Sequence, residues 1–148
     1  SPRRGSNFVT SKVVKGACAI KMGKQKELAL GNLDASRDWG HAKDYVEAMW
    51  MILQHDTPDD YTCATGVSHT VRDLCDYTFK ILDLNYEDYV VLDEKYLRPE
   101  ELKDLKGDAT KLRKELGWEL KNSFESMINE MIEVELRSNY NMSLEDII

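Results

Sequence analysis

Apolar side chains recur at helical spacing in five stretches of the chain, and each stretch predicts an amphipathic helix. The first stretch is capped by Ser6 or Asn7 and ends near Gly23. The third begins at Thr70, three residues before Asp73, in a pattern close to a capping box. The side chains expected to face inward on these two helices are Phe8, Val9, Val13, Ala17 and Ile20, and then Val71, Leu74, Cys75, Thr78 and Leu82.

The second stretch begins after His41 and stops at the turn-forming residues 56–60. Its apolar positions are Ala42, Tyr45, Val46, Met49, Trp50 and Leu53. A stripe of Met and Trp at this spacing is typical of a core face, so we expect these side chains to be buried.

The fourth stretch is a short helix that is capped by Asp108 and stops at Gly117, with Trp118 following as an apolar anchor. The last helix starts at Asn122 or Ser123. Its core residues are expected to be Phe124, Met127, Ile128, Met131 and Ile132.

Short strand-like runs at residues 27–30, 61–65 and 89–93 alternate with these helices. Residues 31–36 have turn chemistry, and residues 96–108 form a loop without a sustained period. The alternation predicts an α/β or α+β class. Two or three short strands are too few for a complete doubly wound sheet, so the pattern indicates a piece of a larger fold.

Composition narrows the possible partners. The chain has 148 residues, the size of one domain, and a formal net charge of -7 argues against general nucleic-acid binding. It contains no apolar run that could span a bilayer and no signal-peptide pattern, so we expect no membrane association. Cys18, Cys63 and Cys75 have no paired spacing, which predicts free buried thiols in a reducing, cytoplasmic compartment, and no metal-ligand spacing is present.

No complete catalytic constellation is present in the sequence. The eight glycines form neither a G-x-G-x-x-G pattern nor a P-loop, and no G-x-S-x-G elbow occurs. None of the seven tyrosines is followed by a lysine four residues later, so the Tyr-x-x-x-Lys pair of short-chain dehydrogenases is absent. We therefore assign no catalytic residue.

Several cationic side chains beside turns are candidate anion-binding groups. Arg3 and Arg4 precede the first helix, Lys12 lies inside it, Arg37 precedes a tryptophan, and Arg98 precedes a proline. A guanidinium matches phosphate geometry with paired donors. Surface salt bridges are the alternative interpretation of these same residues.

Three segments together resemble the GDP-mannose 4,6-dehydratase family, which belongs to the extended short-chain dehydrogenase/reductases. These segments are SPRRGSNFVTSK, LGNLDASRDWGHAKDYVEAMW and YLRPEE…GDATKLRKELGW, and they follow one another in order along nearly the whole chain. The resemblance implies the α/β, NAD(P)-binding Rossmann-like fold of that family. It implies that residues 1–148 form its carboxy-terminal, sugar-nucleotide-binding part, without the amino-terminal Rossmann cofactor domain.

The resemblance also implies a reaction. Family members convert GDP-mannose to GDP-4-keto-6-deoxy-mannose by internal hydride transfer with bound NADP and loss of water, on the way to fucose and rhamnose. The full-length enzyme is a lyase and is expected to assemble as a homodimer or homotetramer. Because the sequence lacks the Tyr-x-x-x-Lys pair, we expect this chain to be inactive alone.

The family's binding residues can be carried over position by position. Arg4 matches a cofactor-binding arginine, and Leu28 and Leu30 match positions that flank the base. The positions that match the GDP-mannose site are Val9, Lys12, Arg37, Arg98 and Glu101. Among these, Glu101 would accept the N–H donors of guanine, whereas Trp39 is expected to be structural.

Two alternatives remain open from the residues. The full-length protein could be another nucleotide-sugar dehydratase, an epimerase or a reductase of the same family. The chain could also be a non-catalytic piece or binding module.

Overall fold

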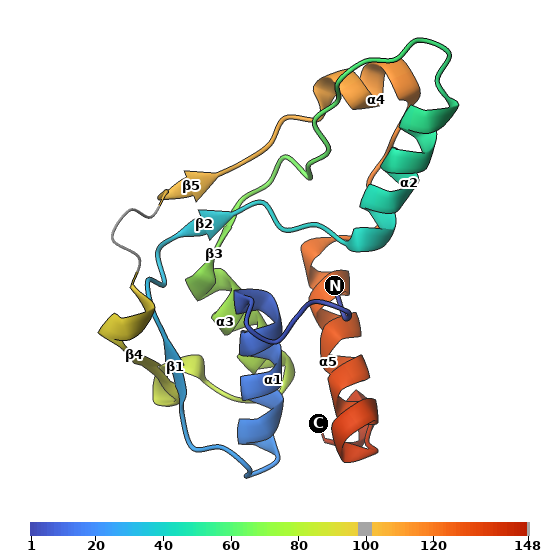
Figure 1. Cartoon of the computed structure of the whole chain (residues 1–148). Coiled ribbons are helices and arrows are strands. Elements are labelled where there is room, and N and C mark those ends of the chain that lie inside the picture. The colour runs from blue at the N-terminus through green and yellow to red at the C-terminus, as the bar shows by residue number, and fades with distance from the viewer. Residues whose placement is uncertain (98–101, 148) are drawn as a thin grey trace.

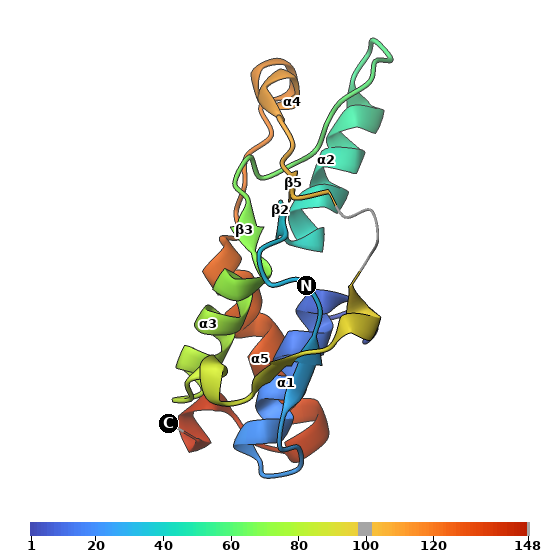
Figure 2. The same cartoon turned by 90° about the vertical axis from the view of Figure 1, so that its left-hand side faces the viewer.

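The chain folds into a three-helix body from which a two-helix arm projects (Figure 1). A computed structural model describes residues 1–97 and 102–147. The α-helices span Val9–Lys21 (α1), Ala42–Gln54 (α2), Val71–Ile81 (α3), Thr110–Leu116 (α4) and Phe124–Tyr140 (α5). The helices α1, α3 and α5 form the body, and α2 and α4 form the arm, as the orthogonal view in Figure 2 also shows.

Two small sheets lie along the body and lead into the arm. Strand β1 (Leu28–Leu30) pairs in parallel with β4 (Val90–Leu92). Strand β2 (Ser36–Arg37) lies between β3 (His69–Thr70), which is antiparallel to it, and β5 (Asp104–Leu105), which is parallel. Single-turn 3₁₀ helices occupy Tyr86–Asp88, Glu94–Tyr96 and Leu144–Asp146. The helices and few strands confirm the predicted α/β class, and the runs at 27–30 and 89–93 do contain strands.

The body core consists of the side chains that the three helices turn toward one another. Helix α1 contacts both α3 and α5, and Ala17, Leu74, Phe79, Ile128 and Ile132 are fully buried between them. Burying one such large aliphatic or aromatic side chain contributes about 1.5–3 kcal/mol relative to leaving it in water. The inner faces predicted for α3 and α5 are confirmed, and on α1 they are confirmed for Val13, Ala17 and Ile20.

The residues predicted to cap α1 and α4 do not occupy the cap positions of these helices. Residues 5–8 form a turn in which the N–H of Phe8 donates to the carbonyl of Gly5, so neither Ser6 nor Asn7 caps α1. Phe8 itself lies at the surface rather than on the inner face. The cap position of α4 is Ala109, and Asp108 instead accepts hydrogen bonds from the backbone and hydroxyl of Thr110 just before it.

The capping box that begins α3 is present as predicted. The hydroxyl of Thr70 accepts from the N–H of Asp73 at 3.0 Å, and the carboxylate of Asp73 accepts from the N–H of Thr70 at 2.8 Å. These two bonds satisfy backbone donors that the first turn of a helix leaves without partners. The bond from the backbone of Thr70 is the main cause that lowers the pKa of Asp73 from its ordinary value.

Replacing Thr70 by alanine should destabilise the chain by about 1 kcal/mol and lower its Tm by about 2–4 °C. The stabilisation from Asp73 depends on its charged form, so it is present above the pKa of an unfolded aspartate. It is lost as the pH falls through the lowered pKa of the folded state. Thermal unfolding of the wild type and of Thr70→Ala, followed between pH 7 and pH 2, measures the difference in their stability. The exposed Thr57→Ala is the control, and an equal loss of stability in that control would contradict the assignment.

The arm has a small core of its own. Ala48 of α2 packs with Ala109, Leu112 and Trp118, all of which are buried. The indole N–H of Trp118 donates to the carbonyl of Asp44 at 2.8 Å, so the predicted apolar anchor is confirmed.

The predicted core face of α2 is wrong for most of its residues, although Tyr45 does pack against the arm core. Its stripe of Val46, Met49, Trp50 and Leu53 is exposed, with exposed fractions of 58%, 61%, 62% and 80%. The side that packs on the arm core instead carries the small Ala48 and the buried Asp44. The periodicity correctly predicted an amphipathic helix, but it carries no information about which part of the protein covers the apolar side.

The strand predicted at residues 61–65 is also wrong. This segment runs extended between α2 and β3 but is assigned no strand, and the chain forms a strand at His69–Thr70 instead. A strand requires a backbone partner, and within residues 1–97 and 102–147 the backbone of residues 61–65 makes no hydrogen bond to another backbone segment.

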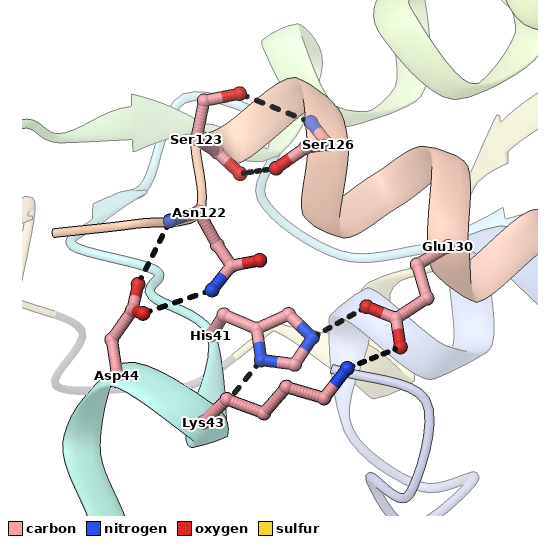
Figure 3. Close-up of polar contacts among 7 residues, drawn as sticks. All are labelled: His41, Lys43, Asp44, Asn122, Ser123, Ser126 and Glu130. Atoms are coloured by element: carbon pink, nitrogen blue, oxygen red, sulfur yellow. Dashed lines mark hydrogen bonds and ion pairs between the residues drawn. The ribbon is translucent and has the colours of Figure 1, made fainter. Parts of the chain in front are cut away.

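The arm joins the body through the first turn of α2 and the start of α5 (Figure 3). The ring of His41 is buried; its Nδ1 accepts from the N–H of Lys43, and its Nε2 lies 2.8 Å from the carboxylate of Glu130. The ammonium of Lys43 lies 3.1 Å from the same carboxylate. Burial raises the pKa of Glu130, but the hydrogen bonds from Lys43 and His41 outweigh it and lower that pKa overall.

A second contact in Figure 3 holds α2 to the segment before α5. The buried carboxylate of Asp44 accepts from both the backbone N–H and the side-chain amide of Asn122, at 3.1 and 2.8 Å. Ser123 then caps α5 by accepting from the N–H of Ser126. Helix α2 is therefore oriented by two polar contacts near its N-terminus. Within residues 1–97 and 102–147, no helix combines the length and the hydrophobicity that crossing a membrane requires.

Candidate functional site

A cleft of about 680 Å³ lies where the start of α1, the β1–β2 turn and the 3₁₀ helix Glu94–Tyr96 meet. Its walls combine apolar side chains, a lysine and an arginine. The residues that line it are Ser6, Asn7, Phe8, Val9, Lys12, Leu30, Gly31, Asn32, Ala35, Arg37, Trp39, Val71 and Tyr96. Its volume lies within the range of small-molecule sites, which are mostly apolar clefts with a few convergent polar groups.

Lys12 is held in the cleft by two neighbours from distant parts of the chain. Its ammonium donates to the carbonyl of Ala29 at 2.6 Å and lies 3.5 Å from the centre of the Tyr96 ring. The cation–π contact and the hydrogen bond together fix a long, flexible side chain. An ammonium carries three donors, so the bond to Ala29 uses one of them.

Arg37 enters the cleft from β2, the central strand of the three-stranded sheet. Its Nη1 donates to the carbonyls of Ser36 and Leu102, at 2.7 and 2.8 Å. These bonds orient the guanidinium along the sheet. The predicted turn before β2 is present, because the N–H of Asp34 donates to the side chain of Asn32 at 2.9 Å.

Gly31 begins that turn because the backbone of Tyr96 passes directly over it. A Cβ built at Gly31 would collide with the carbonyl oxygen of Tyr96. The missing side chain thus lets the 3₁₀ helix approach the turn and brings the Tyr96 ring to Lys12.

Asp38 ties together three chain segments directly behind Arg37. Its Oδ1 accepts from the N–H and the hydroxyl of Thr65, at 3.0 and 2.6 Å. Its Oδ2 accepts from the N–H groups of Gly66 and Gly107, at 2.9 and 3.2 Å. A carboxylate that accepts several such bonds fixes the backbone around it. Asp38 therefore holds the end of β2 against residues 65–66 and 107.

Trp39 packs against the body core, as predicted, and its ring stacks on that of Phe124 with 6.2 Å between centroids. It also forms part of the wall of the cleft. The indole thus separates the main cleft from a second one of about 460 Å³, to which it contributes as well.

Arg4 lies in this second cleft rather than in the main one. Its guanidinium lies 3.4 Å from the centre of the Phe8 ring, and Phe8, Val9 and Trp39 line both clefts. The two clefts therefore adjoin, with Phe8 and Trp39 between them.

Some of the residues assigned from the resemblance share the main cleft, and others lie elsewhere. Val9, Lys12, Leu30 and Arg37 come together in the main cleft, and Arg4 lies in the adjoining cleft. Leu28 does not line the main cleft, because its side chain is buried against Gly16 of α1. Arg98 and Glu101 lie outside the described residues.

Sequence reasoning missed Tyr96 and Asp38. Tyr96 meets Lys12 only because the β1–β4 pairing brings residues near 30 and 92 together, and no short-range spacing encodes that contact. Asp38 carried no local signal either, because the N–H groups from which it accepts belong to Thr65, Gly66 and Gly107, far along the chain.

Solved structures confirm the fold. RMD from Pseudomonas aeruginosa, complexed with NADPH, matches 91% of this chain and 44% of its own chain, with a TM-score of 0.83 and 21% identity. The dTDP-glucose 4,6-dehydratase of Bacillus anthracis, in complex with NAD, matches 94% of this chain and 42% of its own, with a TM-score of 0.77 and 19% identity. This chain therefore shares the fold of about two-fifths of each of these longer chains.

Sequence relatives identify the family. The GDP-mannose 4,6 dehydratase 1 of Arabidopsis thaliana is 51% identical over 92% of this chain, and that match spans 38% of the relative. The human GDP-mannose 4,6 dehydratase is 42% identical over 92% of this chain and 41% of its own length. The chain thus spans about two-fifths of the relatives that it matches. Because the family model described as GDP-mannose 4,6 dehydratase matches residues 1–131, this chain belongs to the GDP-mannose 4,6 dehydratase family.

Proposed function

We propose that this chain is the sugar-nucleotide-binding part of a GDP-mannose 4,6-dehydratase that uses NADP to make GDP-4-keto-6-deoxy-mannose. The observation that carries this proposal is the meeting of Lys12 and Arg37 in one cleft of about 680 Å³, in a chain of this family. Two cations in a cleft with mixed polar and apolar walls suit a diphosphate that joins a base to a sugar.

Each side chain then has a separate task in binding. Arg37 presents a planar fork of donors to the diphosphate from β2, while Lys12 supplies a point charge from α1. Val9 and Leu30 provide apolar surface for the rest of the nucleotide. Glu101 is assigned to the guanine edge on the basis of sequence.

The adjoining cleft suits part of the cofactor. The Arg4 guanidinium is a donor group that fits a phosphate of NADP, and it lies one side chain away from the main cleft. When bound, NADP supplies the acceptance and return of the hydride. The relevant residues of this chain only bind and orient, since the sequence lacks the Tyr-x-x-x-Lys pair. Activity therefore requires the longer protein, for which assembly as a homodimer or homotetramer and a cytoplasmic location remain predictions.

Turnover of GDP-mannose by the full-length protein tests the proposal. With NADP, the protein should release water from GDP-mannose and yield the keto sugar, which mass spectrometry detects as the loss of one water molecule. A correctly folded protein that leaves GDP-mannose unchanged would contradict it. Preference for UDP or dTDP over GDP as a competitor would favour another nucleotide-sugar enzyme of the family.

Replacing Glu101 by alanine should weaken GDP binding by about 10- to 100-fold, because a carboxylate that accepts two N–H donors makes charge-assisted hydrogen bonds. UDP binding should change much less, since uracil lacks the guanine N1/N2 edge. Isothermal titration with both nucleotides measures the two affinities. The exposed Glu87→Ala serves as the control, and an equal loss for GDP and UDP would remove Glu101 from the base site.

A further inference from the structure

A cation of the chain itself lies against the ring of Tyr96 in the wall of the main cleft. The ammonium of Lys12 is 3.5 Å from the ring centre, well within the limit of about 6 Å for attraction between a cation and an aromatic face. The two residues belong to elements far apart in sequence, α1 and the 3₁₀ helix Glu94–Tyr96. The contact therefore exists only in the folded chain, where the ring excludes water from one side of the ammonium.

The 3₁₀ helix that carries Tyr96 is fixed against β1 and the turn that follows it. The N–H of Asp93 donates to the carbonyl of Leu30 at 2.9 Å, and the carboxylate of Asp93 accepts from the N–H of Lys95 at 3.1 Å. The backbone of Tyr96 then passes over Gly31, where a side chain would collide with the Tyr96 carbonyl. Backbone contacts thus set the position of the ring independently of any ligand.

Lys12 benefits from this fixed ring because a lysine side chain is long and flexible. Holding such a side chain still in order to bind an anion costs conformational entropy. Here the hydrogen bond to the carbonyl of Ala29, at 2.6 Å, and the contact with the Tyr96 ring restrain it in advance. The ammonium has three donors, and that bond leaves two of them for a ligand.

We propose that Tyr96 is a positioning residue that holds the ammonium of Lys12 in place for a phosphate group of the bound nucleotide. This inference rests on the proposed function, which assigns the diphosphate to Lys12 and Arg37. The ring acts through Lys12 and does not itself bind the ligand. Loss of the ring should therefore weaken every nucleotide that carries a diphosphate, whatever its base.

A second lysine beside the same ring provides a matched control. The ammonium of Lys95 lies 4.8 Å from the ring centre of Tyr96. Its side chain is exposed, pairs with Asp93 at 2.7 Å and does not line the cleft. Two cations thus approach one ring, and of these two Lys12 is the one in the cleft. Lys95→Ala removes the outer cation and leaves the contact between Lys12 and Tyr96 intact.

Isothermal titration of the full-length protein with GDP and with UDP tests the role of Tyr96. Tyr96→Leu should weaken both nucleotides by about tenfold, because the ammonium is no longer restrained. Tyr96→Phe keeps the ring and should bind within about twofold of the wild type, as should Lys95→Ala. Lys12→Ala should lose at least as much affinity as Tyr96→Leu. The double variant should bind no more weakly than Lys12→Ala alone, because the ring acts only through that lysine.

The Tm of each variant checks that the fold is kept, as expected for a side chain that is 44% exposed. Tyr96→Met, which fills more of the space of the ring than leucine does, provides a second measurement of the same loss. Normal GDP affinity in folded Tyr96→Leu and Tyr96→Met would overturn the proposal. Equal losses in Tyr96→Phe and Tyr96→Leu would also overturn it, because the hydroxyl would then be the important group.

Two further outcomes would contradict the proposal. Additive losses in the double variant would mean that the ring acts on the ligand directly, and a loss confined to GDP would place the ring at the base. Turnover separates this inference from the proposed function. A protein that leaves GDP-mannose unchanged but shows the expected non-additive losses would refute the function and leave the role of Tyr96 standing. Conversion of GDP-mannose together with additive losses would do the reverse.

Discussion

Replacing Arg37 by alanine should weaken GDP binding to the full-length protein by about 10- to 100-fold, because a charge-assisted hydrogen-bonding pair contributes roughly 1.5–3 kcal/mol. The guanidinium lines the main cleft from the central strand β2, where its bonds to the carbonyls of Ser36 and Leu102 orient it. Arg37→Lys keeps the charge but loses the planar fork, so its affinity for GDP should lie between those of the wild type and Arg37→Ala. Isothermal titration with GDP measures all three proteins.

A matched control separates binding from folding. Arg72→Ala removes another arginine, one that pairs with Asp34 at 2.8 Å and does not line the cleft. Its GDP affinity should remain within about twofold of the wild type, as expected for a surface pair. If Arg37→Ala bound GDP normally while keeping its Tm, the diphosphate site would have to lie elsewhere.

Replacing Asp38 by alanine should lower stability by about 2–4 kcal/mol and the Tm by roughly 10 °C. The change removes the acceptor of four hydrogen bonds and strands the N–H groups of Thr65, Gly66 and Gly107 in a partly buried junction. Asp38→Asn retains one carbonyl oxygen and should lose about half as much, because its NH₂ group cannot accept a hydrogen bond. Thermal and urea unfolding give the values.

Asp38 should also affect binding, because it fixes the strand end that carries Arg37. We expect GDP affinity to fall by about tenfold in Asp38→Asn at temperatures where that variant is fully folded. Asp34→Ala is the control, since Asp34 lies in the turn before β2, is strongly exposed and should change neither quantity. Unaltered GDP affinity in a destabilised Asp38→Asn would restrict Asp38 to a role in stability.

Short-range physics explains which features were predictable. The capping box of Thr70 and Asp73, the stop at Gly117 and the inner faces of α3 and α5 depend on residues within one or two turns of each other. The alternation of helices and short strands predicted the α/β or α+β class, and the positions of Lys12 and Arg37 made them candidate anion-binding groups. The family likeness then added Val9 and assigned all three to one site. The structure gathers these three into one cleft.

The remaining features depend on segments far apart in sequence. Lys12 meets Tyr96 only through sheet pairing, and Asp38 reaches Gly107 only because β2 and β5 are neighbours. The prediction for α2 failed for a related reason. The spacing of Val46, Met49, Trp50 and Leu53 determines that one side of the helix is apolar, whereas tertiary packing decides that this side faces outward in the present chain.

By itself, the sequence determined where the helices form, which of their sides are apolar and to which family the pattern conforms, because these properties arise from neighbouring residues and their side-chain chemistry. Only the tertiary structure decided which cations share a cleft, which carboxylate braces the strand that carries Arg37, and which apolar face lacks a partner. Those outcomes depend on contacts whose geometry exists only after distant backbone segments have paired.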